Sequence, residues 1–388
     1  MFRSIMAVYP WDLLDEGLDA GLDRLRGELG IDHLAFWAAT PPTAQFRPRR
    51  TEPRFFCTGG GLMFRPDLQR YRATRIKPVA SSWLKGKDRI AALAQACEAR
   101  SMGISAIVSA SRVGQVAQRH PETACKNAFG DVSHAALCLV NADVQGYLCS
   151  VVADIASRGW VEAIELTDFV VQWSQAWTVE LPLMDSNNDA ARSLLAFCFC
   201  ESCRRRAAAA GVDIESAARF VCVTLQRWFD AGGAAGADED LAGLIAEHPP
   251  FKAYCDWRAG ELASLLAQIA RASACPIVLV RSASDDERIQ HQALDYSLTN
   301  GVVTKVYSDE AVEAARCRDA ARSYAALPAS APAMAQTSKL VSLFSKAAEA
   351  GLSGIQIDHY GALAEPMLTS LRQAIRYARR LQANPAEA

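Results

Sequence analysis

Short runs of apolar residues alternate with longer amphipathic stretches along almost the whole chain. This rhythm is typical of β/α units, in which buried parallel strands alternate with the helices that cover them. We predict strands at residues 4–9, 31–38, 104–110, 161–168, 275–281, 301–307, 331–336 and 354–359. Amphipathic helices are predicted at 14–29, 86–101, 142–158, 213–230, 251–273, 309–325, 338–350 and 366–383. Eight alternating strands predict an α/β protein with the (β/α)8 TIM-barrel fold.

Two segments interrupt the alternation. Residues 40–80 are rich in Gly, Pro and Arg and follow the second predicted strand, and residues 169–212 follow the fourth. Gly- and Pro-rich stretches favour loops over regular elements. We therefore predict one barrel domain over residues 1–385, with loop insertions after strands 2 and 4.

The amino-acid composition indicates which kinds of binding partner and which cellular compartment to expect. The 388 residues are 51% hydrophobic and carry a formal net charge of −2, with the basic residues spread along the chain. Without a basic cluster interleaved with aromatic residues, we expect no nucleic-acid partner. No apolar run of about 18 residues and no leader-like segment is present, so we expect a soluble protein without a membrane partner. Twelve cysteines indicate a reducing compartment, by default the cytoplasm.

Three of these cysteines lie very close together. Cys198, Cys200 and Cys203 form C-x-C-x-x-C within FCFCESC. Thiolates at this spacing converge readily on one tetrahedral zinc ion, for which a fourth ligand must come from elsewhere. The alternative is a set of ordinary buried cysteines, which are common in apolar cores.

This cluster resembles one in the zinc-bearing β-galactosidases of glycoside hydrolase family forty-two. Those enzymes carry a C-x-C-x-x-C after strand 4, an upstream cysteine, and a His-Pro-Glu after strand 3, which His120, Pro121 and Glu122 match here. The resemblance covers about residues 100–210. It implies Cys138 as the fourth zinc ligand, with Cys125 as the alternative. Four cysteines leave no open position on the metal, so the zinc is expected to be structural.

The same resemblance breaks down at the catalytic carboxylates. The family has Asn-Glu at the end of strand 4 and a glutamate at the end of strand 7. Here strand 4 ends IELTDF, and the predicted seventh strand, APAMAQ, has no carboxylate. The family's catalytic pair is therefore not carried over.

Side chains alternate between the two faces of a strand, which allows each predicted strand to be sorted. In strand 4, apolar Ile164 and Leu166 suit the helices, which turns Glu165 and Thr167 inward. The same sorting turns further polar and aromatic groups inward, namely His33, Trp37, Lys305, Tyr307, Gln356 and Asp358. Other candidates stand at or just after strand ends, namely Trp11, Asp12, Asp168, Arg281, His359 and Tyr360. Because buried ionisable groups are costly unless paired, this gathering predicts a polar active site at the C-terminal face.

Aromatic residues are also frequent after the predicted strands. Trp11, Trp37, Trp173, Trp177, Tyr307 and Tyr360 all fall at strand ends or in the following loops. Flat apolar faces beside hydrogen-bonding groups suit sugar rings. Stabilisation of long loops is the alternative reason for either Trp173 or Trp177.

We therefore predict a glycoside hydrolase-like enzyme that acts on a carbohydrate. Glycosidic cleavage requires one carboxylic acid and one carboxylate. Glu165 is the candidate acid/base and Asp358 the second carboxylate, with Asp168 and Asp12 as alternates. His33, Arg281, Lys305 and Tyr307 would bind hydroxyl groups or an acidic sugar, and His359 is either a proton shuttle or a core residue.

Two other functions remain open at this point. Lys305 among apolar neighbours could form a Schiff base, as in an aldolase-type lyase. A sugar-binding barrel that has lost its chemistry would also lack the family's carboxylates. A homo-oligomer is possible, although no interface is recognisable in the sequence.

Overall fold

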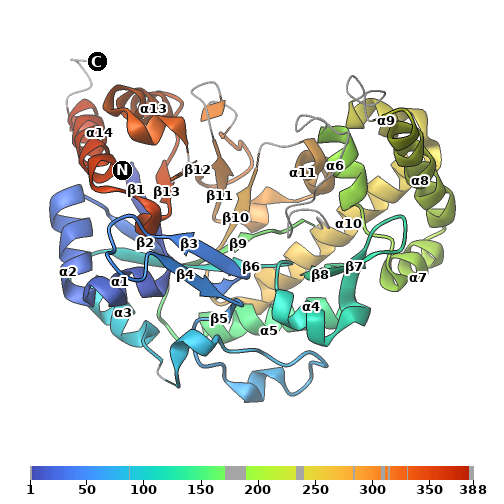
Figure 1. Cartoon of the computed structure of the whole chain (residues 1–388), viewed down its shortest axis with the longest axis horizontal. Helices are drawn as coiled ribbons and strands as arrows, with labels where there is room; N and C mark the ends of the chain where they lie inside the picture. The colour runs from blue at the N-terminus through green and yellow to red at the C-terminus, as the bar shows by residue number, and fades with distance from the viewer. Residues whose placement is uncertain are drawn as a thin grey trace.

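The computed structural model describes residues 2–86, 88–170, 189–232, 240–282, 285–306, 311–312, 315–329 and 331–383. Eight parallel strands form a closed barrel, because β1 pairs with both β13 and β2. The strands are β1 Arg3–Val8, β2 His33–Thr40, β6 Gly103–Ser109, β9 Ala163–Thr167, β10 Ile277–Arg281, β11 Gly301–Lys305, β12 Ser323–Pro328 and β13 Gly354–Asp358. The predicted (β/α)8 fold is confirmed (Figure 1).

The seventh strand was predicted in the wrong place. β12 occupies Ser323–Pro328, whereas Pro332–Ala335 form a 3₁₀ helix within the segment predicted as a strand. Pro332 starts this helix, and a proline lacks the N–H that a strand ladder requires. The helix predicted at 309–325 also runs too far, because residues 323–325 belong to β12.

Helices surround the barrel and also build the segments beside it. Those described are α1 Pro10–Glu16, α2 Leu18–Asp23, α3 Ile90–Glu98, α4 Gly114–Arg119, α5 Ala142–Ala156, α6 Asp189–Ala196, α7 Glu201–Ala209, α8 Ile214–Asp230, α9 Leu241–Glu247, α10 Pro249–Ala272, α11 Asp285–His291, α13 Thr337–Glu349 and α14 Glu365–Ala383. A π-helical segment continues α2 over Arg24–Leu29. None of the helices within the described ranges is both long and apolar enough to cross a membrane.

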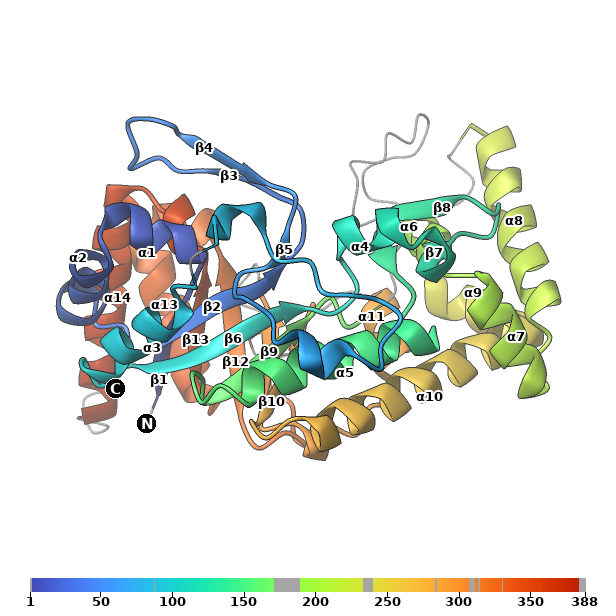
Figure 2. The same ribbon diagram turned by 90° about the horizontal axis from the view of Figure 1, so that it is seen from below.

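A helical lobe lies beside the barrel. Helices α7, α8 and α9 gather at the end of the molecule opposite β1 and β13, and α10 runs from this lobe back to the barrel (Figures 1 and 2). The antiparallel pair β7 Ala124–Lys126 and β8 Val132–Leu137 contributes to the same side. The division of the chain into one domain remains a prediction.

A hairpin follows the second barrel strand. Strands β3 Thr43–Phe46 and β4 Phe55–Thr58 pair antiparallel and project beyond the barrel (Figure 2). A further short strand, β5 Gly61–Leu62, pairs antiparallel with the end of β2. Gln45 in β3 accepts a hydrogen bond from Trp11 Nε1 at 2.7 Å, which attaches the hairpin to the segment after β1.

The two faces of the barrel strands pack into two separate apolar clusters. The larger cluster lies between strands and helices and includes Leu34, Leu166, Leu279 and Ile357. The smaller cluster fills the barrel interior and includes Ile5, Ala7, Ala35, Trp37, Ile107, Val278, Val280, Val303, Tyr324 and Ala326. Side chains of the strands alternate between the two, as expected of a sheet buried on both faces.

Candidate functional site

Glu165 lies inside the barrel. It stands in register with Ile107 and Val278, both members of the interior cluster. Its Oε1 accepts a hydrogen bond from the Ser105 hydroxyl, whereas its Oε2 has no hydrogen-bond partner in the described part of the chain. Burial, together with the nearby charge of Asp358, raises the pKa of Glu165 to about 7. A carboxyl group with such a pKa can hold a proton near neutral pH and transfer it.

Asp358 ends β13 at the C-terminal side of the barrel. The Gln356 amide donates to Asp358 Oδ1 at 3.2 Å, and it also favours the charged form of Glu165. Gln356 is 2% exposed, and because it interacts with both carboxyl groups it links them in one hydrogen-bond network. The charge of Lys305, at the end of β11, reaches His359 next to this network. Within the described ranges, Lys305 has no ion pair.

Aromatic rings stack at the same end of the barrel. The Tyr9 ring lies 4.4 Å from that of Trp11, 5.6 Å from that of Trp37 and 4.8 Å from that of His359, measured between centroids. Trp37 Nε1 also approaches His359 Nδ1 at 3.3 Å. Burial lowers the pKa of His359, so its imidazole is neutral at pH 7. These stacked and largely buried rings form an aromatic wall next to Asp358.

Asp168 follows β9 in a left-handed backbone conformation, with φ of 54°. This conformation is uncommon outside glycine, although Asp tolerates it better than most residues. The Ser109 hydroxyl donates to Asp168 Oδ2 at 2.6 Å, and the Ser111 hydroxyl donates to its carbonyl oxygen at 2.7 Å. Arg112 lies 3.8 Å from Oδ1. Strained residues held this way gather at functional sites, which keeps Asp168 a candidate carboxylate.

Two predicted binding residues lie away from the C-terminal mouth. His33 faces the interior, but it is the first residue of β2 and therefore stands at the opposite, N-terminal end. Arg281 points to the outer face, where Nε donates to Thr304 Oγ1 at 3.0 Å and the guanidinium faces the ring of Tyr296. Neither can contact a substrate at the mouth, so both assignments are corrected.

Three further predicted residues support the hairpin. The Tyr360 hydroxyl donates to Glu16 Oε2 at 2.8 Å, and its ring packs under Arg49. Trp11 is fully buried, and Asp12 Oδ2 accepts from the Tyr9 N–H at 3.1 Å. Burial raises the pKa of Asp12 to about 7. These contacts bind α1 and the hairpin together. Tyr307, Trp173 and Trp177 lie outside the described residues.

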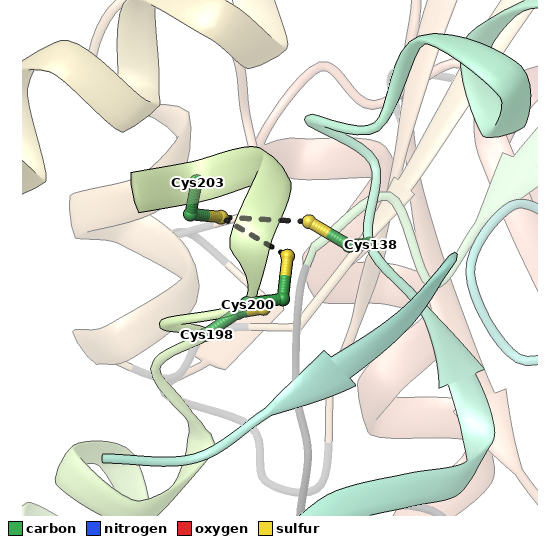
Figure 3. A group of neighbouring side chains, drawn as sticks. All are labelled: Cys138, Cys198, Cys200 and Cys203. Atoms are coloured by element: carbon green, nitrogen blue, oxygen red, sulfur yellow. Dashed lines mark hydrogen bonds between the residues drawn. The ribbon is translucent and has the colours of Figure 1, made fainter. Parts of the chain in front are cut away.

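Four buried cysteines meet in the helical lobe. The Sγ atoms of Cys138, Cys198, Cys200 and Cys203 all lie within 4.8 Å of one another (Figure 3). Cys138 follows β8, and Cys203 lies in the first turn of α7. Sγ of Cys203 is 3.5 Å from that of Cys138 and 3.8 Å from that of Cys200. A tetrahedral zinc site with Zn–S bonds near 2.3 Å has sulfur atoms about 3.8 Å apart. The cluster could therefore hold a metal ion.

A fifth thiol and an arginine adjoin this cluster. A hydrogen bond from Cys125 lowers the pKa of Cys138 to about 5, which favours the thiolate that metals bind. Arg258, in α10, is 1% exposed and lies close enough to interact with Cys138, Cys198 and Cys203. Its Nε and Nη2 have no partner, and no carboxylate pairs with it in the part of the chain that the structure describes. A buried cation in this position calls for a negative charge nearby.

Sequence reasoning missed several of these residues. Ser105 and Ser109 follow from alternation in GISAIVS, since Ile104, Ala106 and Val108 are the outward set. Arg258 occupies a position on the apolar stripe of α10, in line with Tyr254 and Leu262. A charged residue on this apolar stripe was the feature of the sequence that could have indicated a buried partner for Arg258. Nothing in the sequence points to Arg112.

Comparison with known proteins identifies the fold and no more. No family model matches the chain, and no curated protein sequence does. Among solved structures, the catalytic domain of β-amylase from Paenibacillus polymyxa shares 12% identity at a TM-score of 0.55, covering 97% of this chain and 98% of that one. The PgaB (BpsB) glycoside hydrolase domain from Bordetella bronchiseptica gives the same identity, TM-score and coverage.

A third similar structure is larger. α-L-Fucosidase isoenzyme 2 from Paenibacillus thiaminolyticus shares 10% identity at a TM-score of 0.53 and covers 100% of this chain, but the chain spans only 50% of that protein. The barrel is thus one that glycoside hydrolases use. Membership in family forty-two stays a prediction.

Proposed function

We propose that this protein is a glycoside hydrolase acting through two carboxyl groups in its barrel, Glu165 at mid-height and Asp358 at the C-terminal end. The observation that carries the proposal is the pairing of Glu165 with Asp358. Burial raises the pKa of one carboxyl to about 7, the other carboxyl ends a strand nearby, and Gln356 interacts with both. The shared fold of known glycoside hydrolases supports the same class of reaction.

In this proposal the two carboxyl groups have different roles. Glu165, with its raised pKa, donates a proton to the leaving oxygen of the glycosidic bond. Asp358 attacks the anomeric carbon or activates a water molecule. Carboxyl groups about 5–5.5 Å apart would give retention of configuration, and about 6.5–9.5 Å inversion. Asp168 is the alternate carboxylate, because it also follows a strand at this end.

The aromatic wall would hold the sugar. Tyr9 and Trp37 stack on each other and are 6% and 8% exposed, so a sugar would contact only the parts of these rings that the stack leaves open. His359, neutral at pH 7, can accept or donate a hydrogen bond to a hydroxyl group.

The test is a panel of aryl glycosides and oligosaccharides assayed with the wild type, Glu165→Gln and Asp358→Asn. We expect turnover to fall at least about 100-fold in both variants. Glu349→Gln, on the exposed face of α13, is the matched control and should retain wild-type turnover. The configuration of the first product, followed by NMR, reports retention or inversion. Turnover that survives both site substitutions would refute the assignment, and binding without turnover would favour a non-catalytic sugar-binding barrel.

A second candidate function rests on Lys305. This lysine faces the interior beside Ala326, is partly buried, and lies near His359. Such a lysine could form a Schiff base with a carbonyl substrate. Borohydride treatment in the presence of candidate aldehydes and ketones would trap a covalent adduct on Lys305, and mass spectrometry would locate it. Absence of the adduct excludes this function.

We also propose that the four cysteines hold structural zinc. The donor set is complete, the site is buried, and Arg258 offsets the excess negative charge of four thiolates around one divalent ion. The ion would fix the lobe rather than take part in chemistry. None of the 12 cysteines forms a disulfide, and we propose a cytoplasmic location on this basis.

A further inference from the structure

The N-terminal end of the barrel contains a second polar cavity. A chamber of about 70 Å³ is lined by residues at the starts of the strands, among them His33, Ser105, Asn300 and Tyr324. Glu165 closes its inner side. Active sites of this fold lie at the C-terminal end, so this chamber lies at the opposite end of the barrel and shares only Glu165 with the proposed catalytic groups.

The chamber opens into a wider basin. The basin, of about 650 Å³, shares Arg3, Arg322 and Tyr324 with the chamber. These three residues therefore stand at the junction of the two cavities. His33 and Ser105 line the chamber alone, so they lie deeper than the arginines.

Two buried polar atoms in the chamber have no hydrogen-bond partner among the described residues. His33 is 5% exposed and Glu165 3% exposed, and the two atoms are His33 Nδ1 and Glu165 Oε2. An unsatisfied buried polar atom is unfavourable and is usually met by a ligand or by ordered water. The chamber has room for roughly two water-sized groups.

The junction is positively charged. Arg3 lies 3.7 Å from Glu162, a partly exposed pair, whereas Arg322 is exposed and has no ion pair to any residue that the structure describes. Both arginines act on His33, whose pKa is lowered to about 3, chiefly by burial. His33 is therefore neutral at pH 7 and offers a hydrogen bond without a charge. The two guanidinium groups at the junction and the neutral imidazole inside favour an anion, whereas the carboxyl groups of Glu162 and Glu165 also line the chamber.

We propose that this N-terminal cavity binds a short hydroxy carboxylate. Its carboxylate pairs with Arg3 and Arg322 at the junction, since guanidinium groups match carboxylates well. Its hydroxyl group enters the chamber and hydrogen-bonds to His33 Nδ1 and Glu165. The cavity shares Glu165 with the proposed hydrolase, but glycolate binding and glycoside turnover are separate measurements, so that either can fail alone.

Glycolate is the probe, with acetate as the analogue that lacks the hydroxyl group. Binding to the wild type is followed by NMR titration at pH 7, where we expect a roughly millimolar dissociation constant for so small a ligand. Acetate should bind about tenfold more weakly, because the groups in the chamber are then unsatisfied. Arg322→Gln should weaken glycolate about tenfold or more. Arg376→Gln, an exposed arginine on α14, is the matched control and should leave binding unchanged.

A second variant tests the chamber itself. His33→Leu should reduce the preference for glycolate over acetate to about one, and the wild-type preference alone remains informative if this variant fails to fold. Equal binding of the two anions by the wild type overturns the proposal, as does glycolate binding that is indifferent to Arg322→Gln. Failure of glycolate to bind at all shows that the cavity holds solvent only.

Discussion

Replacement of Arg258 by Met removes the buried charge beside the four cysteines but keeps most of the side chain's volume. Arg258 is 1% exposed, and among the residues that the structure describes Nη1 bonds only to the Tyr254 hydroxyl at 2.8 Å and to the Cys198 carbonyl oxygen at 3.5 Å. Both of these partners are neutral. The charge of the guanidinium is therefore balanced only if the cysteines carry negative charge.

The size of the effect follows from the charge of the site. Four thiolates around a divalent ion leave a net charge of −2, which Arg258 partly neutralises. Four protonated thiols leave the guanidinium buried without a counter-charge, at a cost of about 3–5 kcal/mol. Removal of the metal should therefore lower the free energy of unfolding by about 3 kcal/mol more in the wild type than in the Arg258→Met variant. The same cycle predicts metal affinity roughly 100-fold weaker in the variant.

Competition with a chromophoric chelator measures the zinc affinity, and urea unfolding with and without metal measures the coupling. Arg206→Met is the control, because Arg206 borders the same region but pairs with the carboxylate of Glu261. We expect the control to change zinc affinity less than about threefold, as for a partly exposed ion pair. An equal loss of stability on metal removal in wild type and Arg258→Met would refute the charge-balance argument.

Three further predictions concern pH, sugar binding and packing. The folded state binds the Glu165 proton more tightly than the unfolded state, because the pKa of Glu165 is raised from 4.5 to about 7. This difference should add about 3 kcal/mol to the free energy of unfolding below pH 4.5, and the added stability should be lost as the pH rises through 7. Urea unfolding measures this pH dependence, which Glu165→Gln should abolish. Trp37→Leu should raise KM about tenfold for any glycoside that the wild type cleaves, since it removes one ring of the wall, and an unchanged KM would exclude this surface from binding. Leu265→Ala, in the fully buried face of α10, should lower the free energy of unfolding by about 2–5 kcal/mol, and a loss below 1 kcal/mol in urea would mean that α10 is not packed as described.

Hydrophobic periodicity was sufficient to predict seven of the strands but not β12. The segment ARCRDAARSYAALP continues the preceding helix-like composition into the strand, and Ala has little strand preference of its own. Pairing with β11 and β13 decides the conformation of Ser323–Pro328, and such long-range contacts leave no local signature.

The candidate site was only partly predictable for a related reason. Glu165 and Asp358 alternate with clearly apolar neighbours, so their inward orientation could be read from the sequence. In β10 the residues before Arg281 are apolar on both faces, which removes the alternation that fixes the phase. His33 faces the barrel interior as expected, but it lies nearer the N-terminal end of the barrel than predicted, because β2 begins at this residue rather than two residues before it. Arg258 and the cysteines lie in segments that are distant in the sequence, so no motif of fixed spacing could predict their contact.

The placement of the cysteines also has a consequence for synthesis of the chain on the ribosome. Cys138 and Cys203 are 65 residues apart and enclose α5 and β9, and both precede the last four barrel strands. The metal site can therefore close while β10 to β13 have yet to emerge. Metal captured at that moment would anchor the first half of the barrel, whose β9 edge is still open to unwanted strand pairing. The metal supply during translation, rather than afterwards, would then set the yield of folded protein.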